Sequence, residues 1–228
     1  MTIIIAAIGK SHIVVGSDKK GTKEFGGFSF VENSEVKLKN LSNYVVGMIT
    51  GNGYIGAELF ERFKIEKDAG ITKVTSRFSS FCNKEARKIF EIATKTRLPV
   101  KYWEVLPSFI LTGLDPKKGK YAEPKIFRLN PENSFYPTRE KRYAAEGKSF
   151  LAEYLLAKYY NSKATQDELP KFIAQIIFDT GMIDPNVSTE MNISIIDKDG
   201  IRELNKKDID ELVETWDELN LKTILKES

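Results

Sequence analysis

Thr2 is the first side chain in the sequence that could do covalent chemistry. Removal of Met1 would leave a free α-amine and a hydroxyl on this one residue, and aminopeptidases remove an initiator methionine when the next side chain is small. An α-amine has a pKa of about 8, so it is partly neutral at neutral pH and can accept the hydroxyl proton. Thr2 would then be a nucleophile that carries its own base and needs no histidine. Many proteins begin with Met-Thr, so these two residues alone do not identify a hydrolase.

The sequence contains few residues from which other kinds of catalytic centre could be built. His12 is the only histidine, and its place between two apolar runs favours a hairpin turn over a Ser-His-Asp triad. Cys82 is the only cysteine, so no intrachain disulfide can form, and its place on an apolar helix face predicts a buried, inert thiol. One histidine and one cysteine do not make a Cys/His zinc site, so we expect no metal and no cofactor.

The elements that must position Thr2 begin directly after it. Residues 3–8 and 13–16 are continuous apolar runs, and the segment 9–12 between them has the composition of a turn. These runs predict a β-hairpin, and the absence of polar alternation predicts that both strands are buried on both faces.

The rest of the chain falls into blocks of helices and strands. Apolar residues at helical spacing predict helices near residues 55–63, 74–93, 149–160 and 168–180, and a last one that Asn205 caps. Apolar runs bounded by turn signals predict strands at 36–41, 44–50, 108–114, 125–129, 142–145, 191–196 and 201–204. This order predicts an α+β fold, a four-layer αββα sandwich of two antiparallel sheets flanked by helices.

Composition predicts one soluble domain. No linker or low-complexity tract divides residues 1–228, and 41% hydrophobic residues can build a full core. Lys and Arg total 35 against 32 for Asp and Glu, a surplus too small to indicate nucleic acid or a membrane as partner. The N-terminal apolar run lacks a basic region before it and is too short to span a bilayer, so we expect a cytoplasmic protein.

Four segments of the chain resemble the proteasome β-subunit family and its bacterial relative HslV. The family pattern is an N-terminal threonine, a buried hairpin with an acid at its end, a lysine followed by apolar residues, and a strand that ends in glycine. The matching segments are Thr2 to Thr22, Lys37 to Leu41, Val45 to Gly53 and Asp184 to Thr189. The resemblance spans nearly the whole chain, and it implies a sandwich of the N-terminal-nucleophile (Ntn) hydrolase type.

The resemblance implies that Thr2 is the nucleophile and that four further residues assist it. Lys37 would lower the pKa of the Thr2 amine and hydroxyl, because a nearby cation disfavours a second positive charge. Asp18 would pair with Lys37 and hold it charged. The backbone N–H of Gly51 would face the tetrahedral oxyanion. Asp184 would bond near the Thr2 amine.

The resemblance also implies a substrate-binding cleft. The backbones of Thr22 and Gly51 would pair with an extended peptide, a form of strand addition that accepts many sequences. The family positions around the first specificity pocket match Gly21, Glu35, Lys39, Ile49 and Gly53. Glu35 and Lys39 would give this pocket a polar or charged rim.

Each of these roles has a structural alternative. Lys37 and Lys39 could both be solvated strand residues. Asp18 and Asp184 could each be ordinary turn residues, because Asp is common in turns and Pro185 follows Asp184. Gly51 and Gly53 could serve only a strand-to-helix turn.

Three features depart from the family pattern. The stretch between Asp18 and Lys37 is longer and contains the sequence Gly-Gly-Phe at 26–28. Strict alignment puts Lys148 at the position of a serine in the family pattern, where a cation would alter the pKa of the Thr2 amine. Ser149 is one residue further and is the candidate to take over the catalytic role of that serine after a small shift. We also expect no propeptide beyond Met1, as in HslV and the Anbu proteins.

The expected function is that of a threonine peptidase that forms an acyl-ester on Thr2. A transpeptidase or ligase would use the same intermediate, as in the connectases, and the sequence does not separate the two. A third alternative is an inactive assembly subunit, which retention of Met1 would favour, because the amine is then not on Thr2. The expected partners are a peptide or unfolded protein substrate, further copies in a homo-oligomeric ring, and an unfoldase.

Overall fold

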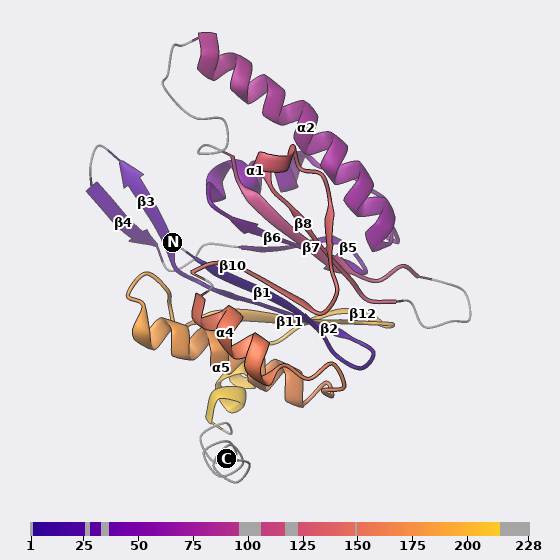
Figure 1. The fold of residues 1–228 in the computed structure, drawn as a ribbon, viewed down its shortest axis with the longest axis vertical. Coiled ribbons are helices and arrows are strands. Elements are labelled where there is room, and N and C mark those ends of the chain that lie inside the picture. Colours follow the sequence, from indigo (N-terminus) through magenta and orange to yellow (C-terminus); the bar gives the residue numbers. More distant parts are fainter. Residues whose placement is uncertain are drawn as a thin grey trace.

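The chain forms an α+β fold with two five-stranded antiparallel sheets (Figure 1). The computed structural model describes residues 2–25, 28–32, 37–95, 106–116, 123–148 and 150–214. Among these, no helix combines the length and the apolar character needed to cross a bilayer.

The first sheet carries the N-terminal hairpin at its centre. Its strand order is β10 (Tyr143–Gly147), β1 (Ile3–Ile8), β2 (Ile13–Asp18), β11 (Met191–Asp197) and β12 (Gly200–Glu203). The apolar runs of β1 and β2 are buried almost throughout, which confirms the prediction from their lack of alternation. The register places Gly147 opposite Ile3 and Met191 opposite Asp18. The start of β1 and the end of β2 therefore meet at one end of this sheet.

The second sheet is a meander of neighbouring strands. Its order is β5 (Leu38–Ser42), β6 (Val45–Thr50), β7 (Ser108–Gly113), β8 (Lys125–Leu129) and β9 (Thr138–Glu140). The prediction located the first four of these but not β9, which has only three residues, none of them buried. A strand so short and exposed leaves no apolar pattern in the sequence.

The helices are α1 (Gly53–Arg62), α2 (Ile71–Lys95), α4 (Phe150–Tyr159) and α5 (Glu168–Ile183), with a 3₁₀ turn, η1, at Pro131–Asn133. The Asn52 side chain caps α1 by accepting the N–H of Ile55 at 3.1 Å. Residues 206–214 are also helical, and Asn205 and Asp208 form reciprocal capping bonds at its start. This last helix begins where the sequence predicted its cap.

Three apolar clusters hold the elements together. One lies between the first sheet and helices α4 and α5, and another between the second sheet and α1 and α2 (Figure 1). Phe60, Phe78 and Phe109 anchor the second cluster, with ring centroids 5.0–5.2 Å apart. The third cluster takes side chains from both sheets, such as Ile4 of β1 and Met48 of β6. The two sheets are therefore joined by buried apolar contacts, which include side chains near the start of β1.

A separate hairpin follows β2 in the sequence. Strands β3 (Gly21–Phe25) and β4 (Phe28–Glu32) pair with each other, with Phe25 opposite Phe28. No strands were predicted between Asp18 and Lys37, a stretch that is longer than in the family pattern. Gly26-Gly27 between two β-prone runs is a hairpin signal that could have predicted this element.

Candidate active site

Asp18 is the centre of the site that the sequence predicted around Thr2. It ends β2 and is fully buried. One of its oxygens, Oδ1, accepts the Thr2 hydroxyl at 2.9 Å, the Ile3 N–H at 2.9 Å and the Lys37 ammonium at 2.6 Å. Three segments that are distant in sequence therefore meet on one carboxylate oxygen.

The other oxygen of Asp18 ties this centre to its surroundings. Oδ2 accepts the N–H of Lys20 at 3.1 Å and that of Ser188 at 3.3 Å. The Lys20 ammonium in turn contacts the carbonyl oxygen of Pro185. The segment before β11 is thus fixed beside the end of β2. Five donors satisfy the carboxylate as an anion, which removes much of the cost of burying it.

Lys37 supplies the positive charge of the site. Its side chain is 3% exposed, and its ammonium donates to Asp18 and also to the Lys20 carbonyl at 2.6 Å. Its own carbonyl accepts the N–H of Ile49 at 3.1 Å, which places Lys37 beside β6 just ahead of β5. A solvated strand lysine, the structural alternative, does not fit this burial. Removing one partner of a buried ion pair of this kind strongly destabilises the folded protein, because the other charge stays buried without compensation.

Thr2 is 9% exposed and is held by its backbone as well as its hydroxyl. Its carbonyl oxygen accepts the N–H of Lys148 at 2.7 Å, just past the pairing of Ile3 with Gly147. Gly147 has φ of +91°, and a Cβ atom there would lie 1.9 Å from the Thr2 oxygen. This position therefore requires glycine both for its backbone angle and for the close approach.

Asp184 is connected to Thr2 through a single intermediate residue, Lys148. It caps the end of α5, and its Oδ1 accepts both the backbone and the side-chain N–H of Asn186 at 2.9 Å. Its Oδ2 lies 3.7 Å from the Lys148 ammonium. The backbone N–H of Asn186 is the main cause that lowers the pKa of Asp184, and Lys148 adds to it. Among the described residues, Asp184 thus reaches Thr2 through Lys148 and has turn-like bonds of its own.

Gly51 and its neighbours lie where β6 passes into α1. Gly51 follows the strand with φ of +81° and is exposed, and Gly53 is the first residue of α1. Ile49 is 4% exposed and packs beneath α1, where a Cβ on Gly56 would lie 2.4 Å from its Cγ2. Ile49 therefore belongs to the apolar cluster between the second sheet and its helices.

The other predicted cleft residues are less closely defined. The Lys39 ammonium contacts the Glu61 carboxylate of α1, and both side chains are largely exposed. Gly21 is buried at the start of β3, and the backbone of Thr22 pairs with Val31. Within the described part of the chain, β3 pairs only with β4, so its other edge has no strand partner. Ser149 and Glu35 lie outside the described residues.

Two groups at the site were not predicted. Ser188 lies in a matched segment, but no role followed from it, because a backbone N–H leaves no mark in a sequence. Glu146 is the second: its side chain is 11% exposed and bonds to Thr50 and Arg128 of the other sheet. An acidic residue inside the apolar strand Tyr-Ala-Ala-Glu-Gly was the available signal.

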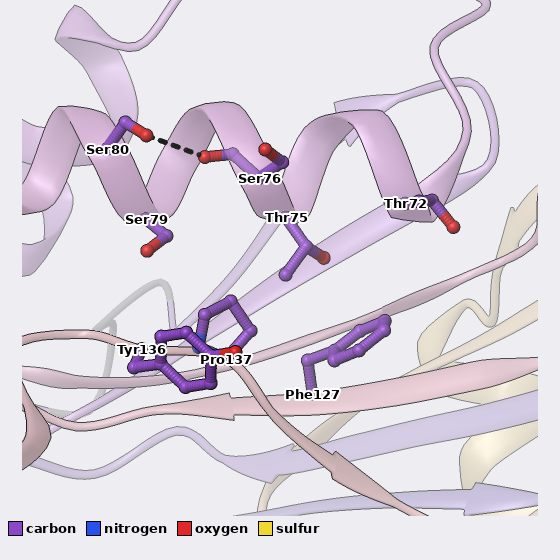
Figure 2. A pocket seen from close by; sticks show the side chains of 8 residues that line it. All are labelled: Thr72, Thr75, Ser76, Ser79, Ser80, Phe127, Tyr136 and Pro137. Atoms are coloured by element: carbon purple, nitrogen blue, oxygen red, sulfur yellow. Dashed lines mark hydrogen bonds between the residues drawn. The ribbon is translucent and has the colours of Figure 1, made fainter.

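A separate hollow of about 420 Å³ opens between α2 and the β8–β9 side of the second sheet (Figure 2). Figure 2 shows hydroxyl side chains of α2 on one wall and aromatic and proline rings on the other. Its lining residues are Thr72, Thr75, Ser76, Ser79, Ser80, Phe127, Tyr136 and Pro137. None of them carries a charge or belongs to the Thr2 cluster, so the chemistry described above does not extend to this hollow.

Comparison of the sequence with protein-family models and with curated proteins gives no match.

Proposed function

We propose that this chain is an Ntn hydrolase of the proteasome β type, which cleaves peptide bonds with Thr2 after Met1 has been removed. The observation that carries the proposal is that the Thr2 hydroxyl and the Lys37 ammonium bind the same buried oxygen of Asp18. The nucleophile and the cation are thereby both held within hydrogen-bond distance of one oxygen atom of the buried anion.

The proposed reaction uses the groups of residue 2 itself. The freed α-amine accepts the hydroxyl proton while Oγ1 attacks the peptide carbonyl carbon. The Lys37 ammonium favours the developing alkoxide and lowers the proton affinity of the amine. The tetrahedral oxyanion is stabilised by the Gly51 N–H, and the C–N bond breaks as the leaving amine takes the proton from the Thr2 amine. Water then hydrolyses the acyl-ester and restores the hydroxyl.

The fold supports this assignment at a coarser level. Two antiparallel sheets share one apolar cluster, and each has a further cluster with its own pair of helices. This is the pattern expected of a four-layer αββα sandwich of the Ntn type. Among the described residues, β3 has no strand partner on its second edge, and this supports binding of an extended peptide by strand addition.

Intact-mass spectrometry with and without a peptide β-lactone tests the proposal. We expect the wild-type mass to lack Met1 and to gain one lactone on Thr2. Thr2→Ala should gain none. Cys82 is fully buried, and burial raises the pKa of its thiol, so this residue should give no competing adduct.

Lys37 and Lys73 provide a matched pair of variants. Lys37→Met should slow labelling at least about 100-fold, the scale of losing one group that stabilises transition-state charge. Lys73→Met changes an exposed lysine of α2 that pairs with Glu66, outside the predicted cleft, and should label like the wild type. A mass that retains Met1, or equal labelling of Thr2→Ala and wild type, would count against the proposal.

We also propose that the protein assembles as a homo-oligomeric ring that encloses the site. Several large apolar side chains on the helices are exposed, among them Tyr54, Phe150, Met182 and Ile183. Light scattering on the purified protein tests this point separately, since a monomer would contradict the ring without affecting the chemistry of Thr2.

A further inference from the structure

Glu146 joins the two sheets through polar contacts close to the candidate site. It lies on β10 opposite Ile4, and its side chain is 11% exposed. Its Oε2 accepts the Thr50 hydroxyl at 3.0 Å, and its Oε1 accepts from Arg128 at 3.3 Å. Thr50 belongs to β6 and Arg128 to β8, so a residue of the first sheet is bonded to two strands of the second.

Both ends of the Thr50–Glu146 bond adjoin the proposed reaction centre. Thr50 is the last residue of β6 and directly precedes Gly51. Glu146 directly precedes Gly147, which packs against the Thr2 carbonyl. One hydrogen bond therefore links the strand that presents Gly51 to the strand that faces Thr2.

The polar and charged groups around Glu146 come from three strands of the second sheet. Thr50 of β6 donates to it, and Arg128 of β8 pairs with it while its Nε lies 2.8 Å from Glu140 of β9. Burial raises the pKa of Glu146, and Arg128 partly offsets that effect. An ionisable group in a desolvated place has to be held by good contacts, and here those contacts cross between the sheets.

We propose that Glu146 is a positioning residue, which through Thr50 fixes the Gly51 backbone N–H relative to the Thr2 hydroxyl. The inference rests on the proposed function, since it assigns a task within that reaction. Glu146 acts without touching the substrate. Its effect comes from the distance between an oxyanion donor and a nucleophile, where a misplacement of about 1 Å can cost about 100-fold in rate.

Thr50→Val tests the bond with little change in shape, because it replaces only the hydroxyl by a methyl group. Thr50→Ser keeps the hydroxyl and is the rescue variant. Thr112→Val is the matched control: Thr112 is buried in β7 of the same sheet, and its hydroxyl donates to the Lys125 carbonyl instead. Each full-length variant is treated with the peptide β-lactone, and its labelling rate constant, its non-covalent inhibition constant and its labelled fraction are measured.

We expect Thr50→Val to lower the labelling rate constant by about 10- to 100-fold and leave the inhibition constant nearly unchanged. Thr50→Ser and Thr112→Val should remain near the wild-type rate. A merely structural role would lower the labelled fraction and leave the rate of the folded fraction intact, which would overturn the proposal. Equal rates in Thr50→Val and wild type would overturn it as well. Absence of labelling in the wild type would instead overturn the proposed function, and this inference with it.

Discussion

A Cβ atom on Gly147 would lie 1.9 Å from the backbone oxygen of Thr2, a distance too short for any side chain to fit. The strand opposite residue 2 approaches it this closely only because position 147 is glycine. Gly51, the other glycine of the site with positive φ, has ordinary contacts, since its Cβ would lie 3.6 Å from the nearest atoms. Gly147 is thus under both a steric and a conformational constraint, whereas Gly51 is under a conformational one alone.

Alanine substitutions should separate these constraints. Gly51→Ala should cost about 1–2 kcal/mol of unfolding free energy, because only the left-handed backbone is strained. Gly147→Ala should cost clearly more, because strain and a backbone collision act together. Urea denaturation of both variants measures the difference, and equal midpoints would show that β10 can move away from Thr2 at little cost.

Removal of the Lys37 charge should destabilise the protein whether or not it is an enzyme. Lys37→Met leaves the buried Asp18 carboxylate without its cation, and breaking such a pair costs about 3–5 kcal/mol. Lys39→Met removes an exposed pair with Glu61 and should cost at most about 1 kcal/mol. Chemical denaturation of the two variants provides the comparison. Similar losses would mean that the Lys37–Asp18 contact contributes no more than a surface pair.

The single histidine should report on its burial through pH. His12 is 1% exposed, and burial is the main cause that lowers its pKa below 6.5, against Asp197 and the Thr165 backbone, which raise it. As pH falls below 6.5, the unfolded chain takes up a proton that the folded chain does not, so stability is lost. The imidazole resonances in NMR should titrate below 6.5, and His12→Gln should lack this part of the pH dependence. A midpoint above 6.5 would contradict the effect of burial.

Glu146 should show the opposite sign. Burial raises its pKa above 4.5, so the folded chain keeps a proton that the unfolded chain has already lost. Its contribution to stability is therefore complete below pH 4.5 and declines as pH rises through the raised pKa. The difference in unfolding free energy between wild type and Glu146→Gln should shift in favour of the variant as pH increases. A difference that is constant with pH, measured by urea titration at several pH values, would show that Glu146 ionises normally.

The sequence predicted best the structural features that a single local segment determines. Continuous apolar runs predicted β1 and β2, and the reciprocal cap of Asn205 and Asp208 lies where the last helix was expected to begin. The resemblance to the proteasome β-subunit family predicted that Thr2, Asp18 and Lys37 lie together, and these three side chains do meet. Their chemistry stays a prediction.

Contacts between distant segments were much harder to predict. Glu146 meets Thr50 because two sheets pack face to face in one register, and nothing local to either residue specifies that register. Asp184 was expected next to the Thr2 amine, but its carboxylate bonds to Asn186 and approaches Lys148. Lys148 in turn donates its backbone N–H to the Thr2 carbonyl oxygen.

The donors of Asp18 come from opposite ends of the chain. Ser188, which completes them, is 170 residues away from Asp18 in sequence. During synthesis on the ribosome, the N-terminal hairpin emerges long before that partner exists. The full set of contacts around residue 2 therefore forms only after most of the polypeptide has been translated, so a nascent chain cannot complete the hydrogen bonds of Asp18.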